Sequence, residues 1–188
     1  TWDVAFASST GRAYAFTAGT TSDLFDTAYS DSGGAWTAQA ASADVDPSNN
    51  EFAWLFASPD PSPGSNRVVL AALTTGSRLP MIAYVSDAWS GASTAITGMQ
   101  NNQRPIFGLG WESWSGQAFL VYALSANASP QYRIWTLGGG WGAASGLPSF
   151  SGANLRNIQV YGHRASSDVW VSGENNQGQL QFARWNGN

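Results

Sequence analysis

The chain repeats one short phrase, a run of apolar residues followed by a turn and a tryptophan, at a nearly constant interval. The closing residues Trp36, Trp89 and Trp141 lie 53 and 52 positions apart, and residues 184–188 begin the phrase a fourth time. Recurrence at a period of about fifty residues is typical of a tandem array of one supersecondary unit. This period constrains the fold more than any other feature of the sequence.

Within each period, large and small residues alternate in short runs that are separated by turns rich in Gly, Ser and Asp. The predicted strands cover residues 2–6, 13–16, 24–29, 52–56, 67–71, 81–85, 106–109, 118–122, 132–135, 158–161, 169–171 and 180–185. The recurring Trp residues mark weaker fourth strands in the first three repeats. Alternation with a period of two between turn residues indicates β-meanders, and no long segment has helical spacing. The sequence therefore predicts an all-β protein.

Four antiparallel strands in roughly every fifty residues are typical of β-propeller blades. A lone four-stranded meander leaves both faces uncovered, so such sheets bury their faces by stacking on one another. We predict one β-propeller over residues 1–188, with blades at about 1–42, 43–98, 99–148 and 149–188, the last without its outer strand. A β-sandwich or an up-and-down barrel would also be all-β, but neither explains the recurring Trp.

The two ends of the chain suggest further expectations. The first residue is Thr1 rather than Met, which predicts a processed or excised segment. A blade that ends on a bare strand edge would invite pairing with another strand. We therefore expect residues 179–188 to be covered by a neighbouring copy, through homo-oligomer formation or strand exchange. A head-to-tail contact of this kind would build an open chain.

The composition favours an extracellular or cell-surface protein and argues against several partners. Charged residues make up only 11% of the chain and the net charge is −4, so no basic surface is expected for nucleic acid. The absence of Cys excludes disulfides, thiolate nucleophiles and Cys-ligated zinc. No apolar run reaches the roughly eighteen residues of a membrane span. We expect neither a cofactor nor a metal.

Few residues are candidates for catalysis. His163 is the only histidine, and because no nucleophile-elbow sequence accompanies it, we interpret it as a surface or turn residue. Glu112 lies between Trp111 and Trp114, a setting suited to an acid catalyst or to sugar stacking. A glycosidase would need a second carboxylate, which could come from Asp3, Asp44, Asp46 or Asp87. Capping of a local turn is the more common role of such acids.

Three other segments have local chemistry. Residues 44–51 carry the densest run of oxygen ligands, but they lack the central Gly and the spacing of a calcium loop, so we interpret them as a polar loop. Residues 59–64 contain three Pro and predict a surface loop. Asn127 matches a glycosylation sequon.

The ten Trp residues raise the question of carbohydrate binding, because indole faces can stack on sugar rings. Most of them recur at one phase of the repeat, so we expect them to pack inside the blades. Trp111 and Trp114 are the pair that the repeat explains least. If the chain binds a glycan or a partner protein, we expect that patch to bind it.

The repeat as a whole resembles those of large secreted bacterial propeller proteins. In these proteins a blade with a Ser-Gly-x-Ala start alternates with a plainer blade that starts with Arg or Asp. Residues 115–122 match the first type, and residues 66–70 and 167–171 match the second. The resemblance covers the whole chain and implies secretion rather than a particular activity.

Residues 30–36 resemble the Asp-box turn of sialidase-like propellers, residues 86–89 form a shortened version, and residues 137–141 lack the acid. The Asp box is a folding device remote from the active site, so the resemblance does not imply hydrolysis. Together with the repeat, it implies structural roles within the blades for Asp31, Trp36, Asp87, Trp89, Trp141 and Trp185.

Residues 184–188 also resemble the blade ends of fucose-binding propeller lectins. Those lectins hold sugar between blades with an Arg, a Glu and stacking Trp residues, so the resemblance implies a site of these residue types. The spacing of the available candidates does not recur from blade to blade. The predicted ligand-binding residues are Trp111, Glu112, Trp114, Arg133, Trp135 and Glu174.

Taken together, these features predict a non-enzymatic extracellular β-propeller module that acts in surface structure, adhesion or self-assembly. A glycan-binding lectin is the first alternative, and a sialidase-like glycosidase is the second.

Overall fold

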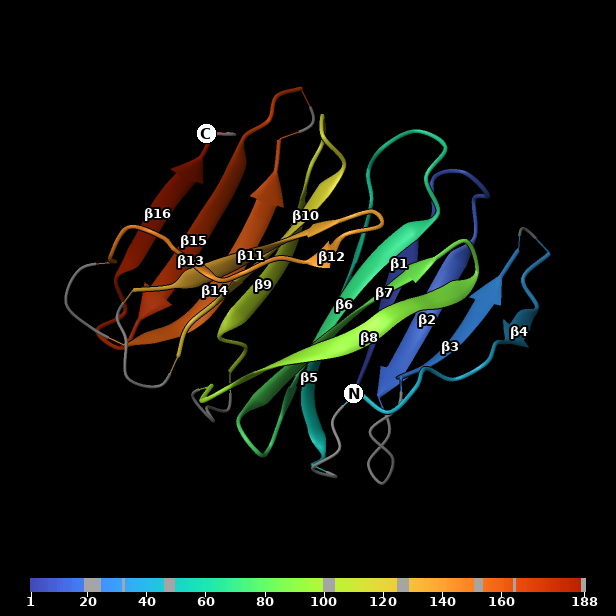
Figure 1. Ribbon diagram of the computed structural model, residues 1–188, viewed down its shortest axis with the longest axis horizontal. Helices are drawn as coiled ribbons and strands as arrows, with labels where there is room; N and C mark the ends of the chain where they lie inside the picture. Colours follow the sequence, from blue (N-terminus) through green and yellow to red (C-terminus); the bar gives the residue numbers. More distant parts are fainter. Residues whose placement is uncertain are drawn as a thin grey trace. The chain divides into compact units, whose positions relative to one another are not determined.

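A computed structural model describes residues 1–18, 25–31, 33–45, 50–99, 104–124, 129–150, 154–163 and 165–186. Its regular elements are β-strands in four antiparallel sheets (Figure 1). The chain divides into two compact units, Thr1–Thr97 and Gly98–Asn188, with two sheets in each. Within these described ranges there is no helix with the length and apolarity needed to cross a membrane.

The first unit consists of two four-stranded meanders in which each strand pairs with the next. The first sheet contains β1 (Trp2–Phe6), β2 (Ala13–Ala18), β3 (Phe25–Ser30) and β4 (Trp36–Ala38). The second sheet contains β5 (Phe52–Pro59), β6 (Arg67–Thr74), β7 (Arg78–Val85) and β8 (Ala88–Thr97).

The second unit has a five-stranded and a three-stranded sheet. The third sheet of the chain contains β9 (Phe107–Glu112), β10 (Gln117–Tyr122), β11 (Gln131–Thr136), β12 (Gly140–Trp141) and β13 (Ser145–Gly146). Both short strands, β12 and β13, pair with β11. The fourth sheet contains β14 (Leu155–Gly162), β15 (Val169–Asn175) and β16 (Leu180–Trp185).

The predictions of an all-β fold and of antiparallel sheets in four repeats are confirmed, and the last sheet has three strands as expected. The predicted strand at 24–29 begins at Leu24, which lies outside the described residues. β5 continues to Pro59, which the sequence analysis placed in a loop. β5 is an edge strand of its sheet, where the missing N–H of Pro costs no ladder hydrogen bond.

The repeat is visible in the strand register. β1 pairs with β2 in the same register as β9 with β10, so Trp2 corresponds to Phe107 and Phe6 to Trp111. The β1–β2 turn contains Gly11 and the β9–β10 turn contains Gly116. Both have a φ of 66°, a left-handed conformation that favours glycine. The first and third sheets are therefore copies of one unit at the level of single residues.

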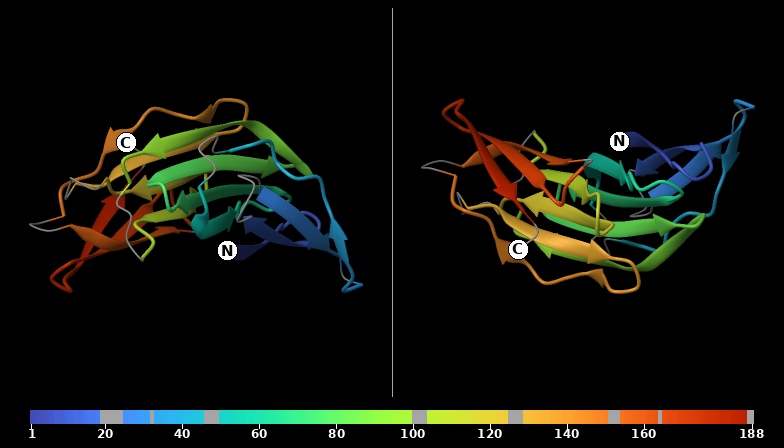
Figure 2. Two further views of the ribbon diagram at one scale, coloured as in Figure 1. Left: turned by 90° about the horizontal axis from the view of Figure 1, so that it is seen from below. Right: turned by 90° about the horizontal axis from the view of Figure 1, so that it is seen from above.

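An aromatic core joins the two sheets of the first unit, which lie face to face (Figure 2). Tyr14 and Phe16 on β2 and Tyr84 on β7 are almost completely buried. The ring centroid of Tyr84 is 5.5 Å from that of Tyr14 and 5.7 Å from that of Phe16, in edge-to-face geometry. Burial of each such ring contributes on the order of 2 kcal/mol to stability.

The core of the second unit depends on close backbone approach. Gly108 and Gly110 on β9 lie against Val160 on β14, and a Cβ on Gly110 would be 2.7 Å from Val160 Cγ1. A Cβ on Gly162 would be only 1.7 Å from the carbonyl oxygen of Trp111. These Gly residues let the third and fourth sheets approach more closely than side chains would allow.

Candidate functional site between the first two sheets

The Trp patch expected to bind a ligand is largely part of the sheet packing. Trp111 lies near the end of β9 and is 3% exposed, and Trp135 on β11 is equally buried. Their ring centroids are 5.8 Å apart at an interplanar angle of 74°. Ala118 pairs with both residues, one on each neighbouring strand. The two indoles therefore pack on one face of the third sheet instead of lining an open site.

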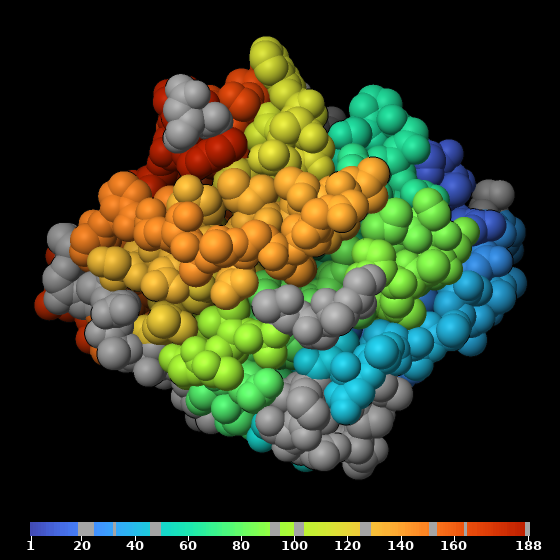
Figure 3. All heavy atoms as spheres, viewed as in Figure 1, coloured from blue at the N-terminus to red at the C-terminus, as the bar shows by residue number. Residues whose placement is uncertain are grey.

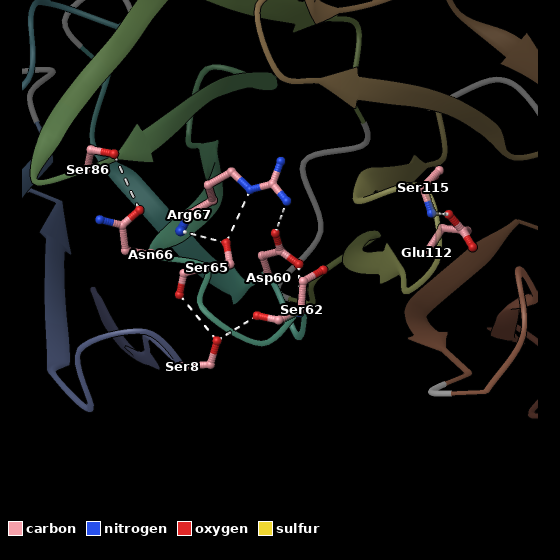
Figure 4. Close-up of polar contacts among 9 residues, drawn as sticks. All are labelled: Ser8, Asp60, Ser62, Ser65, Asn66, Arg67, Ser86, Glu112 and Ser115. Atoms are coloured by element: carbon pink, nitrogen blue, oxygen red, sulfur yellow. Dashed lines mark hydrogen bonds and ion pairs between the residues drawn. The ribbon is translucent and has the colours of Figure 1, made fainter.

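Glu112 is a buried anchor for the turn between β9 and β10. Its side chain is 1% exposed, and its carboxylate accepts hydrogen bonds from the backbone N–H groups of Trp114, at 2.9 Å, and of Ser115 (Figure 4). Backbone donors thus satisfy the carboxylate locally. Trp114 itself is 73% exposed at the tip of this turn. The structure supports the capping role that the sequence analysis weighed against catalysis.

Arg133 and Glu174, the other predicted ligand-binding residues, lie on different sheets. Arg133 on β11 donates Nη1–H to the carbonyl oxygen of Gly142 at 3.1 Å. Glu174 on β15 forms an ion pair with Arg104 at 3.5 Å. Glu174 also borders a shallow hollow of about 240 Å³, which is lined further by Asn157, Gln159, Ser172, Gly178 and Leu180. The described structure contains no contact that joins Arg133 to Glu174.

The four Trp residues that were expected to have structural roles differ in their surroundings. Trp89 packs against the first unit's core and donates its Nε1–H to the carbonyl oxygen of Ala40 at 2.8 Å. Trp185 packs against the core of the second unit, and Trp141 is partly buried. Trp36 differs from the expected packing, because it is 53% exposed. It lies on β4, a three-residue strand at the edge of its sheet.

Asp31 and Asp87 were expected to have structural roles within their own blades. Both carboxylates accept hydrogen bonds from the same residue, Arg12. The Arg12 Nε–H group donates to Asp31 Oδ1 at 2.7 Å, and Nη1–H donates to Asp87 Oδ2 at 2.7 Å. Asp31 follows the last strand residue of β3, whereas Asp87 belongs to the second sheet. Arg12 therefore bridges a carboxylate from each sheet. We call Arg12, Asp31 and Asp87 the arginine bridge.

Two tyrosines complete the surroundings of the arginine bridge. The guanidinium carbon of Arg12 lies 4.2 Å from the ring centroid of Tyr29, within the range of a cation–π contact. The hydroxyl of Tyr14 donates to Asp87 Oδ1 at 2.5 Å. Asp87 thus uses one oxygen for Arg12 and the other for Tyr14, which fixes the orientation of its carboxylate.

Tight turns place the residues of the arginine bridge. Gly11, with its positive φ, donates its N–H to the carbonyl oxygen of Ala7 at 3.0 Å, and Arg12 follows directly. Ser86 and Asp87 form the two-residue turn between β7 and β8, with φ values of 51° and 62°. Two positive φ values are what a type I′ hairpin requires, although non-glycine residues rarely adopt them. Such backbone strain costs roughly 1 kcal/mol or more per residue and is common at functional sites.

The neighbouring β5–β6 loop is held by a buried ion pair (Figure 4). Asp60 is 2% exposed, and it pairs with Arg67 and accepts the backbone N–H of Ser62 at 2.9 Å. Ser8 in the β1–β2 turn donates its hydroxyl to the carbonyl oxygen of Ser62 at 2.6 Å. This Pro-rich segment lies at the surface as predicted, but it is also fastened to the turn that precedes Arg12. The space-filling view shows the turns of the first unit, coloured from blue to green, at its surface (Figure 3).

The aromatic rings below the arginine bridge are the buried ring of Tyr84 and the partly buried ring of Trp89. Tyr84 and Trp89 have ring centroids 5.0 Å apart. The hydroxyl of Tyr84 is buried and has no hydrogen-bond partner within the described residues. Burial, together with the negative charge of Asp87, raises the pKa of Tyr84 to about 12. Burial also raises the pKa of Tyr14, and its hydrogen bond to Asp87 adds to the effect.

The arginine bridge combines a fixed positive charge with exposed acceptors. The hydrogen bond to Asp31 is the main factor that raises the pKa of Arg12. The side chains of Asp31 and Asp87 are 59% and 37% exposed, so both carboxylates face solvent. A guanidinium has five N–H donors, and the two carboxylates engage it through Nε and Nη1. The site can therefore offer hydrogen-bond donors and acceptors to a polyhydroxylated ligand.

The sequence analysis placed Asp31 and Asp87 but missed Arg12, Tyr14, Tyr29 and Tyr84 as site residues. One signal was available. An Arg stands at or just before the second strand in both of the first two repeats, Arg12 before β2 and Arg67 at the start of β6. In the third repeat the residue at the start of β10 is Gln117. The contact between sheets, which turns this pattern into a site, could not be inferred from spacing alone.

The remaining predictions concern isolated residues. His163 lies exposed in the β14–β15 turn, as expected, and its Nδ1 contacts the Ser166 hydroxyl at 3.0 Å. Residues 46–49 of the acidic segment and Asn127 of the sequon lie outside the described residues. Among the residues that are described, no three His, Asp or Glu side chains gather as metal ligands.

No protein-family profile matches the chain, and no curated protein is similar to it in sequence. Among solved structures, AofleA from Arthrobotrys oligospora matches with a TM-score of 0.67 and 13% identity, over 99% of this chain and 53% of that one. Aleuria aurantia lectin in complex with α-methyl-L-fucoside matches with a TM-score of 0.53 and 15% identity, over 94% of this chain and 52% of the lectin. NanB sialidase from Streptococcus pneumoniae matches with a TM-score of 0.58 and 15% identity, over 97% of this chain and 30% of the sialidase.

These matches establish the fold class. The four antiparallel sheets correspond to blades of β-propellers that include a fucose-specific lectin and a sialidase. The chain spans about half the length of the first two proteins. At such low identity the likeness concerns the fold and not the ligand.

Proposed function

We propose that the chain is a non-catalytic glycan-binding module and that the arginine bridge is its binding site. The observation that carries the proposal is the position of Arg12, held between a carboxylate from each sheet and above the ring of Tyr29. This cluster brings charged donors and charged acceptors together beside solvent, with the guanidinium held against an aromatic ring.

The chemistry of the cluster suits neighbouring hydroxyl groups of a sugar. A hydroxyl can donate to a carboxylate and accept from a guanidinium at the same time, and charge-assisted hydrogen bonds are the stronger ones. Asp31 and Asp87 supply the acceptors and Arg12 the donors. The strained turn at Asp87 and the braced loop at Asp60 hold these groups in place before a ligand arrives, which reduces the entropic cost of binding.

One of the similar solved structures is a lectin in complex with α-methyl-L-fucoside, which makes this glycoside a rational first probe. One further point supports binding rather than hydrolysis. Glu112, the acid weighed as a catalyst, is occupied with backbone donors of its turn. We therefore expect no turnover of chromogenic glycosides, including sialosides. Release of chromophore that is lost in Glu112→Gln would contradict the non-catalytic part of the proposal.

The binding test is a calorimetric titration of the 188-residue chain with methyl α-L-fucoside and with other monosaccharide glycosides. If one of them binds, Arg12→Ala should weaken it at least about tenfold, because a charged hydrogen-bond donor is lost. The matched control is Arg184→Ala. Arg184 also pairs with an Asp, at 2.9 Å, and lies near a Trp ring, but it belongs to the second unit.

Equal affinity of Arg12→Ala and the unaltered chain for the glycoside would show that the arginine bridge is not the binding site. A glycan array extends the test, and an array without any signal would end the proposal of glycan binding.

We further infer an extracellular or cell-surface location, where glycans are abundant and where adhesion would use such a site. Fractionation of producing cells tests this location.

A further inference from the structure

Two sheet faces of the chain expose large apolar side chains. The first face, on the outer side of the first sheet, includes Trp2, Phe6 and Trp36, which are 71%, 66% and 53% exposed. The last face, on the outer side of the fourth sheet, includes Leu180 and Phe182, which are 61% and 65% exposed. Tyr161 and Trp170 also lie on the last face, together with the charged Arg184 and Glu174. Apolar patches of this kind in soluble proteins usually mark interaction surfaces.

The repeat indicates that the first face is built to be covered. By strand register, Trp2 corresponds to Phe107 and Phe6 to Trp111. Phe107 is completely buried and Trp111 is 3% exposed. The same positions of the same structural unit are therefore buried in the third sheet and exposed in the first. An aromatic residue is present in both cases.

The same comparison holds for the last face. Val68 opposite Tyr84 in the second sheet corresponds to Val169 opposite Trp185 in the fourth, since both pairs face the partner sheet of their unit. In the same register, Trp170 on β15 corresponds to Val69 on β6. Phe182 on β16 corresponds to Met81 on β7. Val69 and Met81 are completely buried. At these two positions the fourth sheet exposes large apolar side chains where the second sheet buries them, whereas Arg184 stands where the second sheet has Ala83.

We propose that a second copy of this chain covers both faces, with the first face of each copy against the last face of the other. The repeat supplies the chemical match, since sheets of the first kind bury the one face and sheets of the second kind bury the other. We choose two copies of these 188 residues because they cover 53% and 52% of two of the similar propeller proteins. Two copies together have about the length of one such protein. The proposal is independent of glycan binding.

Each contact joins two unlike faces, and two such contacts related by a two-fold axis close the assembly as a dimer. The test is sedimentation velocity of the 188-residue chain over a roughly hundredfold range of concentration, because mass action favours the dimer at the upper end. The expected mass is twice the 19.9 kDa of one chain. A chain that stays monomeric throughout would overturn the proposal and leave further repeats of a longer polypeptide as the cover.

Two single variants locate the contacts. Phe6→Glu and Phe182→Glu should each raise the dissociation constant about a hundredfold or more, because each buries a charge in the interface. Leu137→Glu is the matched control, since Leu137 is 63% exposed at a turn that belongs to neither face. Far-UV circular dichroism confirms that each variant is folded.

A mixture of the two variants provides a second readout. Phe6→Glu retains an intact last face and Phe182→Glu an intact first face, so the mixture should associate more tightly than either variant alone. Dimers that persist in both single variants would overturn the assignment of the faces, as would larger open assemblies of the unaltered chain.

Discussion

The two units of the chain share a strand register but differ in what lies between their sheets. In the first unit, Arg12 and Asp31 face the second sheet above a layer of aromatic rings. The corresponding positions in the second unit are Gln117 and Thr136, because Ala13 opposite Ser30 matches Ala118 opposite Trp135. The second unit therefore lacks both members of this ion pair at the equivalent place.

The difference extends into the packing. An aromatic pair lies between the sheets of both units, Tyr14 with Tyr84 in the first and Phe119 with Trp185 in the second. In the second unit Gly108 and Gly110 also let β9 approach β14 closely. The chemistry of the rings differs: Tyr14 has a hydroxyl that donates to Asp87, and Phe119 at the equivalent position has none. One structural repeat thus carries the arginine bridge in the first unit, and the second unit has uncharged residues at the positions of Arg12 and Asp31.

The largest expected effect tests the close approach in the second unit. Gly162→Ala would place a Cβ 1.7 Å from the Trp111 carbonyl oxygen, so strands must move apart. We expect the free energy of unfolding to fall by about 3 kcal/mol, at the upper end of overpacking effects. Urea denaturation measures this change. Gly146→Ala is the matched control, since a Cβ there meets no atom within 4 Å, and similar losses in both variants would refute the contrast.

A smaller effect distinguishes two tyrosines of the first unit. Tyr14→Phe removes a hydrogen bond to the charged Asp87 and should cost about 2 kcal/mol. Tyr84→Phe removes a buried hydroxyl that has no partner among the described residues, so stability should stay within about 0.5 kcal/mol or rise. Paired urea denaturation curves measure both changes. Equal losses would mean that Asp87 does not hold Tyr14 as described.

A third expected effect is a pH dependence that the first unit contributes. The pKa of Tyr84 is raised from 10.0 to about 12, so the unfolded chain releases this proton at lower pH than the folded chain does. The resulting stability is complete below about pH 10 and is lost as the pH rises through about 12. Denaturation midpoints measured at intervals over this range should fall less steeply in Tyr84→Phe. Identical slopes in the variant and the unaltered chain would contradict the assignment.

The sequence predicted the fold well because the repeat acts locally. Strand alternation and turn residues placed the strands near their observed positions, and the period of the Trp residues predicted sheets of similar construction. Pro59 shows the limit of such reasoning, because its place in β5 depends on β5 being an edge strand.

The candidate site was much harder to predict. Aromatic composition drew attention to Trp111 and Trp135, yet burial depends on which face of a sheet is covered, and spacing does not reveal that. Asp31 and Asp87 were recognised as turn residues, but their carboxylates reach across to Arg12 from two different sheets. Contacts between residues distant in sequence follow from the stacking of sheets, which a repeat pattern implies without specifying the partners.

The most direct test of the account is a two-dimensional NMR titration of the chain with the glycoside that binds most tightly in calorimetry. The account predicts shifts confined to the first unit, at the Arg12 Nε–H, the backbone N–H of Asp87 and the Trp89 indole N–H, with Gln117 and its neighbours unchanged. Shifts centred on Trp114 or in the hollow beside Glu174, with the Arg12 signal unmoved, would contradict it.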